Sequence, residues 1–212
     1  TVGTARATPR RRHLKRPQLK GTFQVTRMSP GLLQPIRETC ERHGIDPTPR
    51  LLFASVADQR LIECRQVAGW EFVEERRIII STSRNGVGQA DGSEKTPLGL
   101  HRIAEKFGDN LPAGMVFKGR QVTGTVEDKP DAAIAHRVLW LEGLEPGFNQ
   151  GGNVDTHARY VYIHGVGDES TLGQPASRGC LHMAATDLLP FHDRTPPGAL
   201  LWITETSMGQ GN

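Results

Sequence analysis

The chain has 212 residues, with 26 lysines and arginines against 23 aspartates and glutamates, a formal net charge of +3. Seven of the basic residues and none of the acidic ones fall within residues 1–20, which leaves 19 basic against 23 acidic residues, a net charge of −4, in the remainder. A basic folded surface that tracks nucleic acid is therefore not expected, and the aromatic content of 6% also disfavours one. No run of 18 apolar residues occurs and no apolar segment follows the basic start, so neither a transmembrane helix nor an intact secretory signal is expected.

Four segments are predicted along the chain. Residues 1–28 contain many basic and few apolar residues, too few to offset the entropy of folding, so they are expected to form an extended, flexible arm. We expect a helix and linker over residues 29–49, the main domain over residues 50–205, and a short tail over residues 206–212. The arm can be a solvated tail, can dock on an anionic surface such as membrane, wall polymer or nucleic acid, or can pack on the acidic body.

Periodicity and turn residues predict the elements in chain order. Residues 29–44 are expected to be a helix, because Ser29-Pro30 is a start signal and Gly44 a stop signal. Strands are expected at 51–57 and 60–67, which flank a turn at Asp58-Gln59, and then at 71–82, 98–104, 137–141, 160–164, 180–183 and 199–204. Residues 105–135 are predicted to be mostly loop, and residues 186–193 a short helix with Thr186 as its N-cap. With 24 glycines and 14 prolines, many short strands and few helices, the fold is predicted to be mostly β, a sandwich or barrel.

Three cysteines, Cys40, Cys64 and Cys180, are too few for a disulfide framework. Cys40 lies in a helical pattern and Cys64 in a strand pattern, so both are expected to be core thiols. No CxxC, HExxH or histidine-rich cluster occurs, so no metal site is predicted.

Cys180 has a different setting, since it follows the turn Ser177-Arg178-Gly179. Gly179 permits a tight bend, which allows backbone N–H groups near Cys180 to point at a developing oxyanion. His164 ends an apolar strand, where its imidazole can take the thiol proton and give a thiolate near neutral pH. A single Cys and a single His at this spacing are also common as structural residues, so spacing alone leaves both interpretations open.

Several ordered motifs resemble the L,D-transpeptidases with a YkuD-type catalytic domain. That family has His-Gly on a strand, then about fifteen residues, then Ser/Thr-His-Gly-Cys; here the matching residues are His164-Gly165 and Ser177-Arg178-Gly179-Cys180. The resemblance extends over roughly residues 50–205 and includes these further segments: Asp58-Gln59-Arg60-Leu61, Ser81-Thr82-Ser83, Lys95-Thr96-Pro97-Leu98-Gly99 and Pro197-Gly198. It implies a YkuD-like β fold with an N-terminal helix and a short helix after the catalytic cysteine.

The resemblance also implies roles for individual residues. Cys180 matches the nucleophile, His164 the general acid/base, and Gly165 the residue whose carbonyl orients that histidine. Ser177 and Gly179 match the turn that shapes the oxyanion hole. Arg178 stands where the family usually has His, and it can still donate to a carboxylate or a carbonyl.

Three further side chains are weaker candidates for contacts with substrate. His182 stands where the family usually has Arg or Asn, and it alternates with Cys180, so the two face one way on a strand. It is a second base, a substrate contact or a packed polar residue. For Tyr162 the two alternatives are that it lines a groove or that it packs in the core. For Arg159 they are that it pairs with a substrate carboxylate or that it is a solvated residue at a strand end.

The function implied is acyl transfer through a Cys180 thioester that cross-links peptidoglycan tetrapeptide stems, in the periplasm or cell envelope, without metal or organic cofactor. The alternatives are an L,D-carboxypeptidase or amidase on the same fold, a non-catalytic wall-binding module, and a nucleic-acid binder led by the basic arm. A nucleic-acid partner is not expected.

Overall fold

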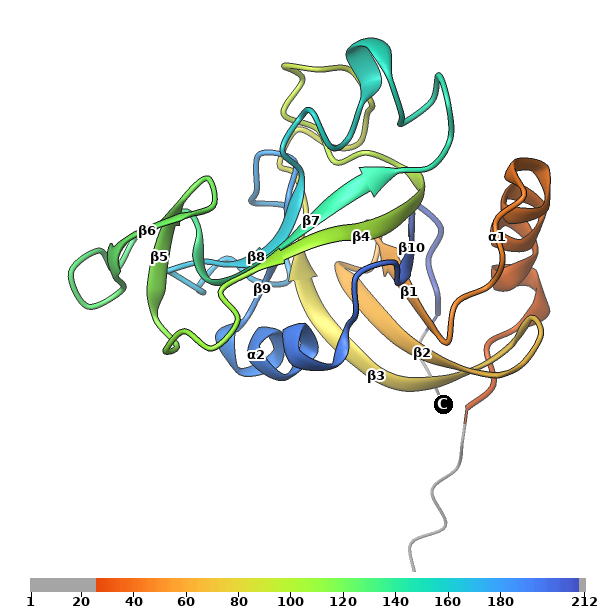
Figure 1. Ribbon diagram of the computed structural model, residues 1–212, viewed down its shortest axis with the longest axis horizontal. Helices are drawn as coiled ribbons and strands as arrows, with labels where there is room; N and C mark the ends of the chain where they lie inside the picture. Colours follow the sequence, from red (N-terminus) through yellow and green to blue (C-terminus); the bar gives the residue numbers. More distant parts are fainter. Residues whose placement is uncertain (1–25, 210–212) are drawn as a thin grey trace, which may run out of the picture.

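Ten strands and two α-helices form residues 26–209, the part of the chain that the computed structural model describes (Figure 1). The helices are α1 (Pro30–His43) and α2 (Ala185–Arg194). The strands are β1 (Arg50–Ser55), β2 (Arg60–Ala68), β3 (Glu71–Ser81), β4 (Gly99–Phe107), β5 (Met115–Lys118), β6 (Gln121–Thr125), β7 (Ala135–Gly143), β8 (Tyr162–Gly165), β9 (Leu181–Met183) and β10 (Leu200–Thr204). The prediction of a mostly β fold with a helix at each of these two places is confirmed.

The strands form one sheet in the order β4-β10-β1-β2-β3-β9-β8-β7-β5-β6, and β4 also pairs with β7. This extra pairing closes eight strands into a barrel and leaves β5 and β6 as a hairpin attached to the outside of β7. Closure removes the exposed edges of those eight strands. Two neighbouring pairs, β1–β10 and β8–β9, are parallel, and the other ladders are antiparallel.

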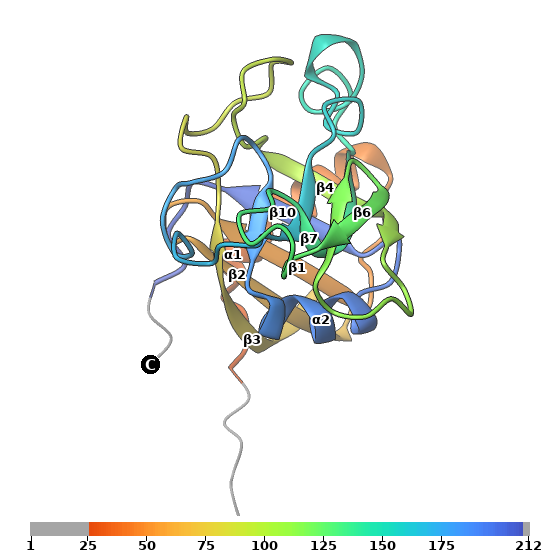
Figure 2. The same ribbon diagram turned by 90° about the vertical axis from the view of Figure 1, so that its left-hand side faces the viewer.

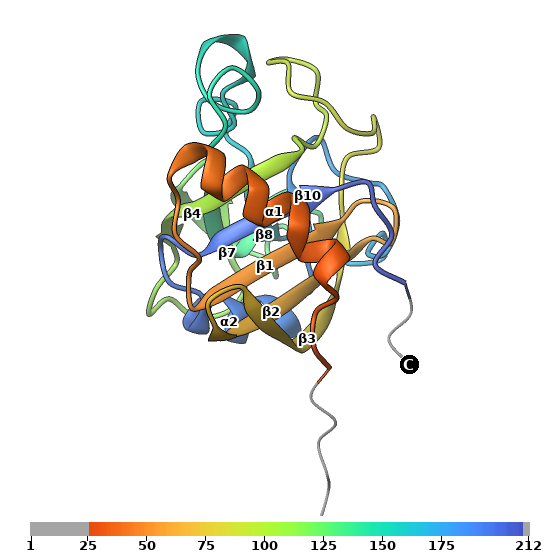
Figure 3. The same ribbon diagram turned by 90° about the vertical axis from the view of Figure 1, so that its right-hand side faces the viewer.

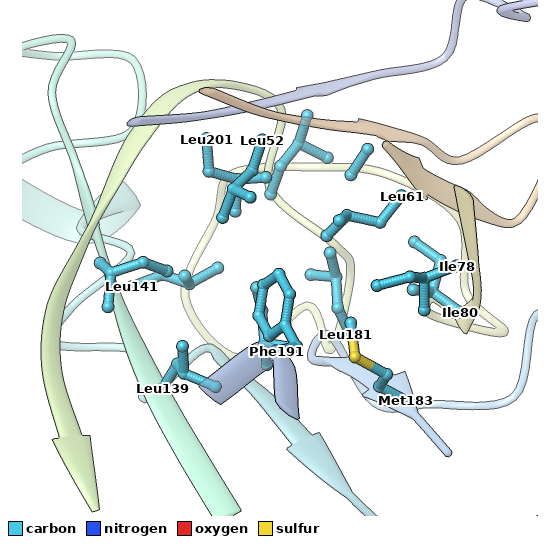
Figure 4. Packing of buried hydrophobic residues seen from close by; sticks show 14 of the residues in the cluster. Leu52, Leu61, Ile78, Ile80, Leu139, Leu141, Leu181, Met183, Phe191 and Leu201 are labelled. Carbon is cyan, nitrogen blue, oxygen red and sulfur yellow. The ribbon is translucent and has the colours of Figure 1, made fainter. Parts of the chain in front are cut away.

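The interior of the barrel is filled by apolar side chains from alternate strand positions (Figure 4). Leu139 and Leu141 of β7, Ile163 of β8 and Leu181 of β9 all point inward. Phe191 of α2 lies among them, so this helix closes one opening of the barrel. Residues at the intervening positions of β7, β8 and β9 face outward.

Helix α1 covers the outer face of β1, β10 and β4 (Figure 3). Its predicted ends are confirmed: Ser29 caps its start through its hydroxyl, and Gly44 ends it with a φ of 64°. Ile36 and Cys40 are fully buried against this face, which also contains Cys64. Cys40 and Cys64 are core thiols, as predicted, and burial raises the pKa of each.

Two predicted boundaries are wrong, and one hairpin was not predicted. Helix α2 begins at Ala185 after Ala184, so Thr186 is not its N-cap. Residues 105–135 are mostly loop, as predicted, but β4 extends to Phe107 and the β5–β6 hairpin interrupts this segment. Tyr160 lies outside β8, with a φ of 56° that breaks the strand before Tyr162.

The last residues of the predicted arm that the structure describes pair with β3. Met28 donates its N–H to the Phe72 carbonyl and is buried, and the Arg27 backbone bridges to Val73. Predictions about residues 1–25 lie outside the described part of the chain.

Two long loops rise from the same end of the barrel (Figure 2). One joins β3 to β4 and the other joins β7 to β8. They contact each other directly, since the Asp91 N–H donates to the Asn153 carbonyl at 2.7 Å. These loops and the β5–β6 hairpin surround the outer face of β8 and β9.

Candidate active site

The register of β8 and β9 brings the predicted residues together. The two strands run parallel with Ile163 opposite Leu181 and His164 opposite His182. Ile163 and Leu181 face the core, so His164 and His182 share the outer face, and their ring centroids lie 4.8 Å apart. Cys180, directly before β9, faces the same way and lines one cavity with both histidines.

The Cys180 thiol contacts the chain on both sides of the β8 start. Its Sγ accepts a hydrogen bond from the Tyr162 N–H at 3.4 Å and donates to the Tyr160 carbonyl at 3.7 Å. Burial raises the pKa of the Cys180 thiol to about 11, while the Tyr162 N–H and the positive charge of Arg159 act in the opposite direction. At neutral pH the group is therefore a thiol, in contrast to the thiolate expected from the sequence.

His164 is buried and held by its own neighbour. Its Nδ1 lies 2.8 Å from the Gly165 carbonyl oxygen, which can only accept, so Nδ1 carries the proton and Nε2 keeps its lone pair. Burial lowers the pKa of His164 to about 4. Among the described residues no hydrogen bond joins the thiol to this imidazole, and both groups are neutral because burial opposes both charges.

Gly165 itself tolerates no side chain. A Cβ there would lie 2.7 Å from His136 Cδ2 and 2.8 Å from the Ala135 carbonyl oxygen. The glycine of the His-Gly pair thus allows β8 to pack closely on β7 while its carbonyl fixes the imidazole.

The turn before Cys180 is held by buried hydroxyl groups. The Ser177 hydroxyl donates to the Cys180 carbonyl at 2.6 Å and accepts from the Gly179 N–H at 3.2 Å. The Thr96 hydroxyl donates to the Gly179 carbonyl at 3.1 Å. Gly179 has a φ of 119°, a region that favours glycine.

These bonds decide which backbone groups near the thiol are free. The Gly179 N–H is occupied by Ser177, so it is not available to an oxyanion in this arrangement. For Cys180, no acceptor for the N–H is found within residues 26–209 outside the strand ladders. The Cys180 N–H is therefore a backbone donor that remains available beside the nucleophile.

The two arginines predicted from sequence are bound to the protein itself. Arg178 pairs with Glu94, with its Nε 2.8 Å from a carboxylate oxygen. Arg159 donates to the carbonyls of Lys95 at 2.7 Å and Gly88 at 3.3 Å. Both arginines therefore hold the loop between β3 and β4 next to the Cys180 turn.

Two hollows meet at the thiol. We call the first the histidine cavity; its volume is about 290 Å³, and its lining includes Arg84, Asp131, His164, Asp168, Ser177, Arg178, Cys180 and His182. We call the second the aromatic cavity; its volume is about 600 Å³, and it is lined by Lys118, Gly119, Arg120, Gln121, Ile134, Tyr160, Tyr162 and Cys180. Cys180 therefore stands at their junction.

Tyr162 lies on the aromatic side. It packs edge-on against Trp140, with ring centroids 5.8 Å apart, and is buried. His182 lies on the other side, where burial lowers its pKa to about 3 and its Nδ1 has no hydrogen-bond partner within the described chain.

Sequence reasoning missed Arg84. It lines the histidine cavity and directly follows Ser81-Thr82-Ser83, one of the motifs that carry the family resemblance. Its place after that strand end was the available signal. Within the described residues no group of three or more His, Cys, Asp or Glu side chains is placed to hold a metal ion.

Comparison with known families agrees with this geometry. Residues 49–203 match the model of the YkuD family, described as the L,D-transpeptidase catalytic domain. The chain belongs to this family. Members of the family act on peptidoglycan. No curated protein matches the chain in sequence. None of the helices in the described residues is long and apolar enough to cross a membrane.

Solved structures resemble the chain at low identity. The helical cell shape determining protein Pgp2 from Campylobacter jejuni is 16% identical with a TM-score of 0.51, over 76% of this chain and 49% of that one. Bd1075 from Bdellovibrio bacteriovorus is 12% identical with a TM-score of 0.49, over 74% and 48%. An L,D-transpeptidase from Xylanimonas cellulosilytica is 16% identical with a TM-score of 0.42, over 80% and 70%. The chain thus spans about half the length of Pgp2 and of Bd1075, and these likenesses concern the fold alone.

Proposed function

We propose that this protein is a cysteine acyltransferase that cross-links peptidoglycan stem peptides, with Cys180 as nucleophile and His164 as general acid/base. The observation that carries the proposal is the common face of β8 and β9, where Cys180 and His164 line one cavity. The family's action on peptidoglycan supports the substrate class, and we assign the reaction to the periplasm or elsewhere in the cell envelope.

The first step forms a thioester. As Sγ of Cys180 attacks the carbonyl carbon of the diaminopimelate–D-alanine bond, the thiol proton passes to Nε2 of His164. The Gly165 carbonyl, which accepts from Nδ1, stabilises the resulting imidazolium. The carbon–nitrogen bond then breaks, His164 returns the proton to the leaving amine, and D-alanine departs.

Charge has to develop on the substrate for this step to proceed. A thiol with a pKa near 11 and an imidazole with a pKa near 4 do not form an ion pair on their own. Proton transfer therefore accompanies attack, and the negative charge moves to the carbonyl oxygen, where the Cys180 N–H can donate to it.

The second step consumes the thioester. An amine from another stem attacks the acyl carbon, loses its proton to His164, and displaces the Cys180 sulfur, which recovers the proton. Two cavities that meet at the thiol suit a reaction with two peptide substrates, one for the donor stem and one for the acceptor. This favours transfer over hydrolysis, in which water replaces the second stem.

The remaining candidate residues support these steps. Ser177 and Gly179 hold the turn that presents Cys180, and Arg178 fixes that turn to the neighbouring loop through Glu94. We assign His182 to contacts with substrate in the histidine cavity and Tyr162 to the aromatic cavity.

Arg159 has a different part in this proposal. Its charge favours the thiolate of Cys180, and its donors fix the β3–β4 loop. We therefore assign it to positioning and electrostatics rather than to a substrate carboxylate.

The test is incubation of the full chain with defined disaccharide-tetrapeptides, followed by mass analysis of the products. A cross-linked dimer with release of D-alanine is expected, and Cys180→Ala should abolish it. Trimmed tripeptide without dimer would instead support a carboxypeptidase on the same fold. Binding to peptidoglycan without any product would support a wall-binding module.

A second measurement isolates the nucleophile. Intact mass after exposure to a carbapenem, a β-lactam that acylates the nucleophile of this family, should show one adduct on the native chain and none on Cys180→Ala. Cys40→Ala, which removes a buried thiol on α1 outside both cavities, should keep the adduct. An adduct that survives in Cys180→Ala would contradict the assignment.

A further inference from the structure

The charged side chains that line the histidine cavity differ in whether they have an ion-pair partner. Arg178 is neutralised by Glu94. Asp131 and Asp168 are exposed on the segments that follow β6 and β8. Arg84 is also exposed, and within residues 26–209 no carboxylate lies within ion-pair distance of its guanidinium. Two arginines line this cavity. Arg178 is paired with Glu94, so Arg84 is the one whose guanidinium N–H groups can bind a carboxylate of a ligand.

The backbone of Arg84 is nevertheless fixed to the active site. Its N–H donates to the Ser177 carbonyl at 3.1 Å, and the preceding Ser83 forms a bridge with Ser177. The hydroxyl of Ser177 in turn is hydrogen-bonded to the Cys180 carbonyl and to the Gly179 N–H. The backbone of Arg84 is therefore anchored to the turn that presents the nucleophile, while its guanidinium forms no ion pair within residues 26–209.

The charge of Arg84 acts on this cavity. Burial is the main cause that lowers the pKa of His182, which lines the cavity, and the positive charge of Arg84 lowers it further. Asp131 and Asp168 lie on other segments of the lining and repel an anion. A carboxylate that enters the histidine cavity is thus drawn toward Arg84 and away from the aspartates.

We propose that Arg84 binds the free α-carboxylate of the residue that leaves in the first step, and so selects stems whose scissile bond is the last one of the peptide. This rests on the proposed function. A guanidinium offers two parallel donors that match a carboxylate, which an internal amide of a longer stem does not provide. His182 Nδ1, buried without a partner in the described chain, is a second polar atom that such a ligand can satisfy.

The test measures binding in the absence of turnover. In the Cys180→Ala background, calorimetry compares a tetrapeptide stem that ends in D-alanine with the same stem ending in D-alaninamide. The carboxylate stem is expected to bind more tightly, and adding Arg84→Gln should weaken it about 10- to 100-fold, the range of one hydrogen bond to a charged group. The amide stem should bind both variants alike, and Arg84→Lys should retain part of the difference.

Arg76→Gln is the matched control, since Arg76 is an exposed arginine of β3 that lines neither cavity. It should leave both affinities unchanged. Equal weakening of the two stems by Arg84→Gln, no effect on either stem, or no binding by the Cys180→Ala chain would each overturn the proposal. Turnover by the native chain is measured separately: an Arg84-dependent preference without any product would refute the proposed reaction while leaving the carboxylate site in place.

Discussion

Cys180 and His164 are held neutral by the same cause, burial on the outer face of β8 and β9. The rate of alkylation by iodoacetamide follows the thiolate fraction, so at Cys180 it should be slow at pH 7 and rise about tenfold per pH unit toward pH 11. Peptide mapping after timed alkylation measures it, with Cys180→Ala to define the background from Cys40 and Cys64. A rate already constant between pH 7 and 9 would show a thiolate and contradict this assignment.

For single residues, the sequence predicts which side chains are reactive better than it predicts which groups the arginines bind. The family resemblance of the motifs around His164-Gly165 and Cys180 singled out residues that the fold places on one face. Arg159 and Arg178 were natural candidates for a substrate carboxylate, yet both donate to the β3–β4 loop. Which arginine stays unpaired depends on contacts between residues up to 84 positions apart, so the only signal for Arg84 in the sequence was its place after Ser81-Thr82-Ser83.

Among the elements, those with strong local signals were predicted well. The cap residues of α1 and the Asp58-Gln59 turn between β1 and β2 gave correct positions because they act within a few residues. The β5–β6 hairpin was missed because β6 is mostly polar and exposed, with no alternation to mark it. Its place is set instead by contacts with β7 and with the aromatic residues of the site.

Besides its pairing with β7, the hairpin is held by cation–π contacts of Arg120 with three rings, of which the Trp140 ring lies nearest. Arg120, at the turn of the hairpin, lies 4.3 Å from the centre of the Trp140 ring, and Trp140 in turn stacks on His157 and Tyr160. Such a contact contributes about 0.5–1 kcal/mol at an exposed site. Arg120→Ala should therefore speed amide hydrogen exchange over residues 115–125 by about two- to fivefold.

Lys118→Ala provides the comparison for that experiment, because Lys118 lies on the same hairpin without a ring beneath it. It should leave exchange in the hairpin near the native rate. Equal acceleration by both substitutions would mean that the hairpin responds to any loss of charge, and that the Trp140 contact does not hold it.

For the molecule as a whole, the sequence predicted a mostly β sandwich or barrel but not how the barrel closes. Closure depends on the pairing of β4 with β7, strands with two others between them in the chain. No local pattern encodes such a pairing, since it follows from the twist and coverage of the complete sheet. The parallel pairing of β8 with β9, which creates the site, is likewise a product of the whole fold.

Burial in the fold keeps several histidines neutral, and this makes the stability of the protein dependent on pH. His101 is fully buried, with Nδ1 3.0 Å from the Gly99 carbonyl oxygen and Nε2 3.1 Å from the Thr156 hydroxyl, and burial lowers its pKa to about 4. Burial also lowers the pKa of His164 to about 4. Each unfolded imidazole gains a proton below its ordinary pKa of about 6.5, while the folded one stays neutral until about pH 4.

The stabilisation from neutral burial is therefore complete above pH 6.5 and is lost as the pH falls toward 4. Each such histidine contributes a slope of up to about 1.4 kcal/mol per pH unit to the free energy of unfolding. Urea unfolding at intervals between pH 6.5 and 5, where most carboxyl groups are still ionised in both states, should show falling stability. His101→Gln should reduce this slope, whatever it does to stability at pH 8. A curve that is flat from pH 8 to 5 would mean that these imidazoles are protonated inside the fold, which their surroundings in the barrel oppose.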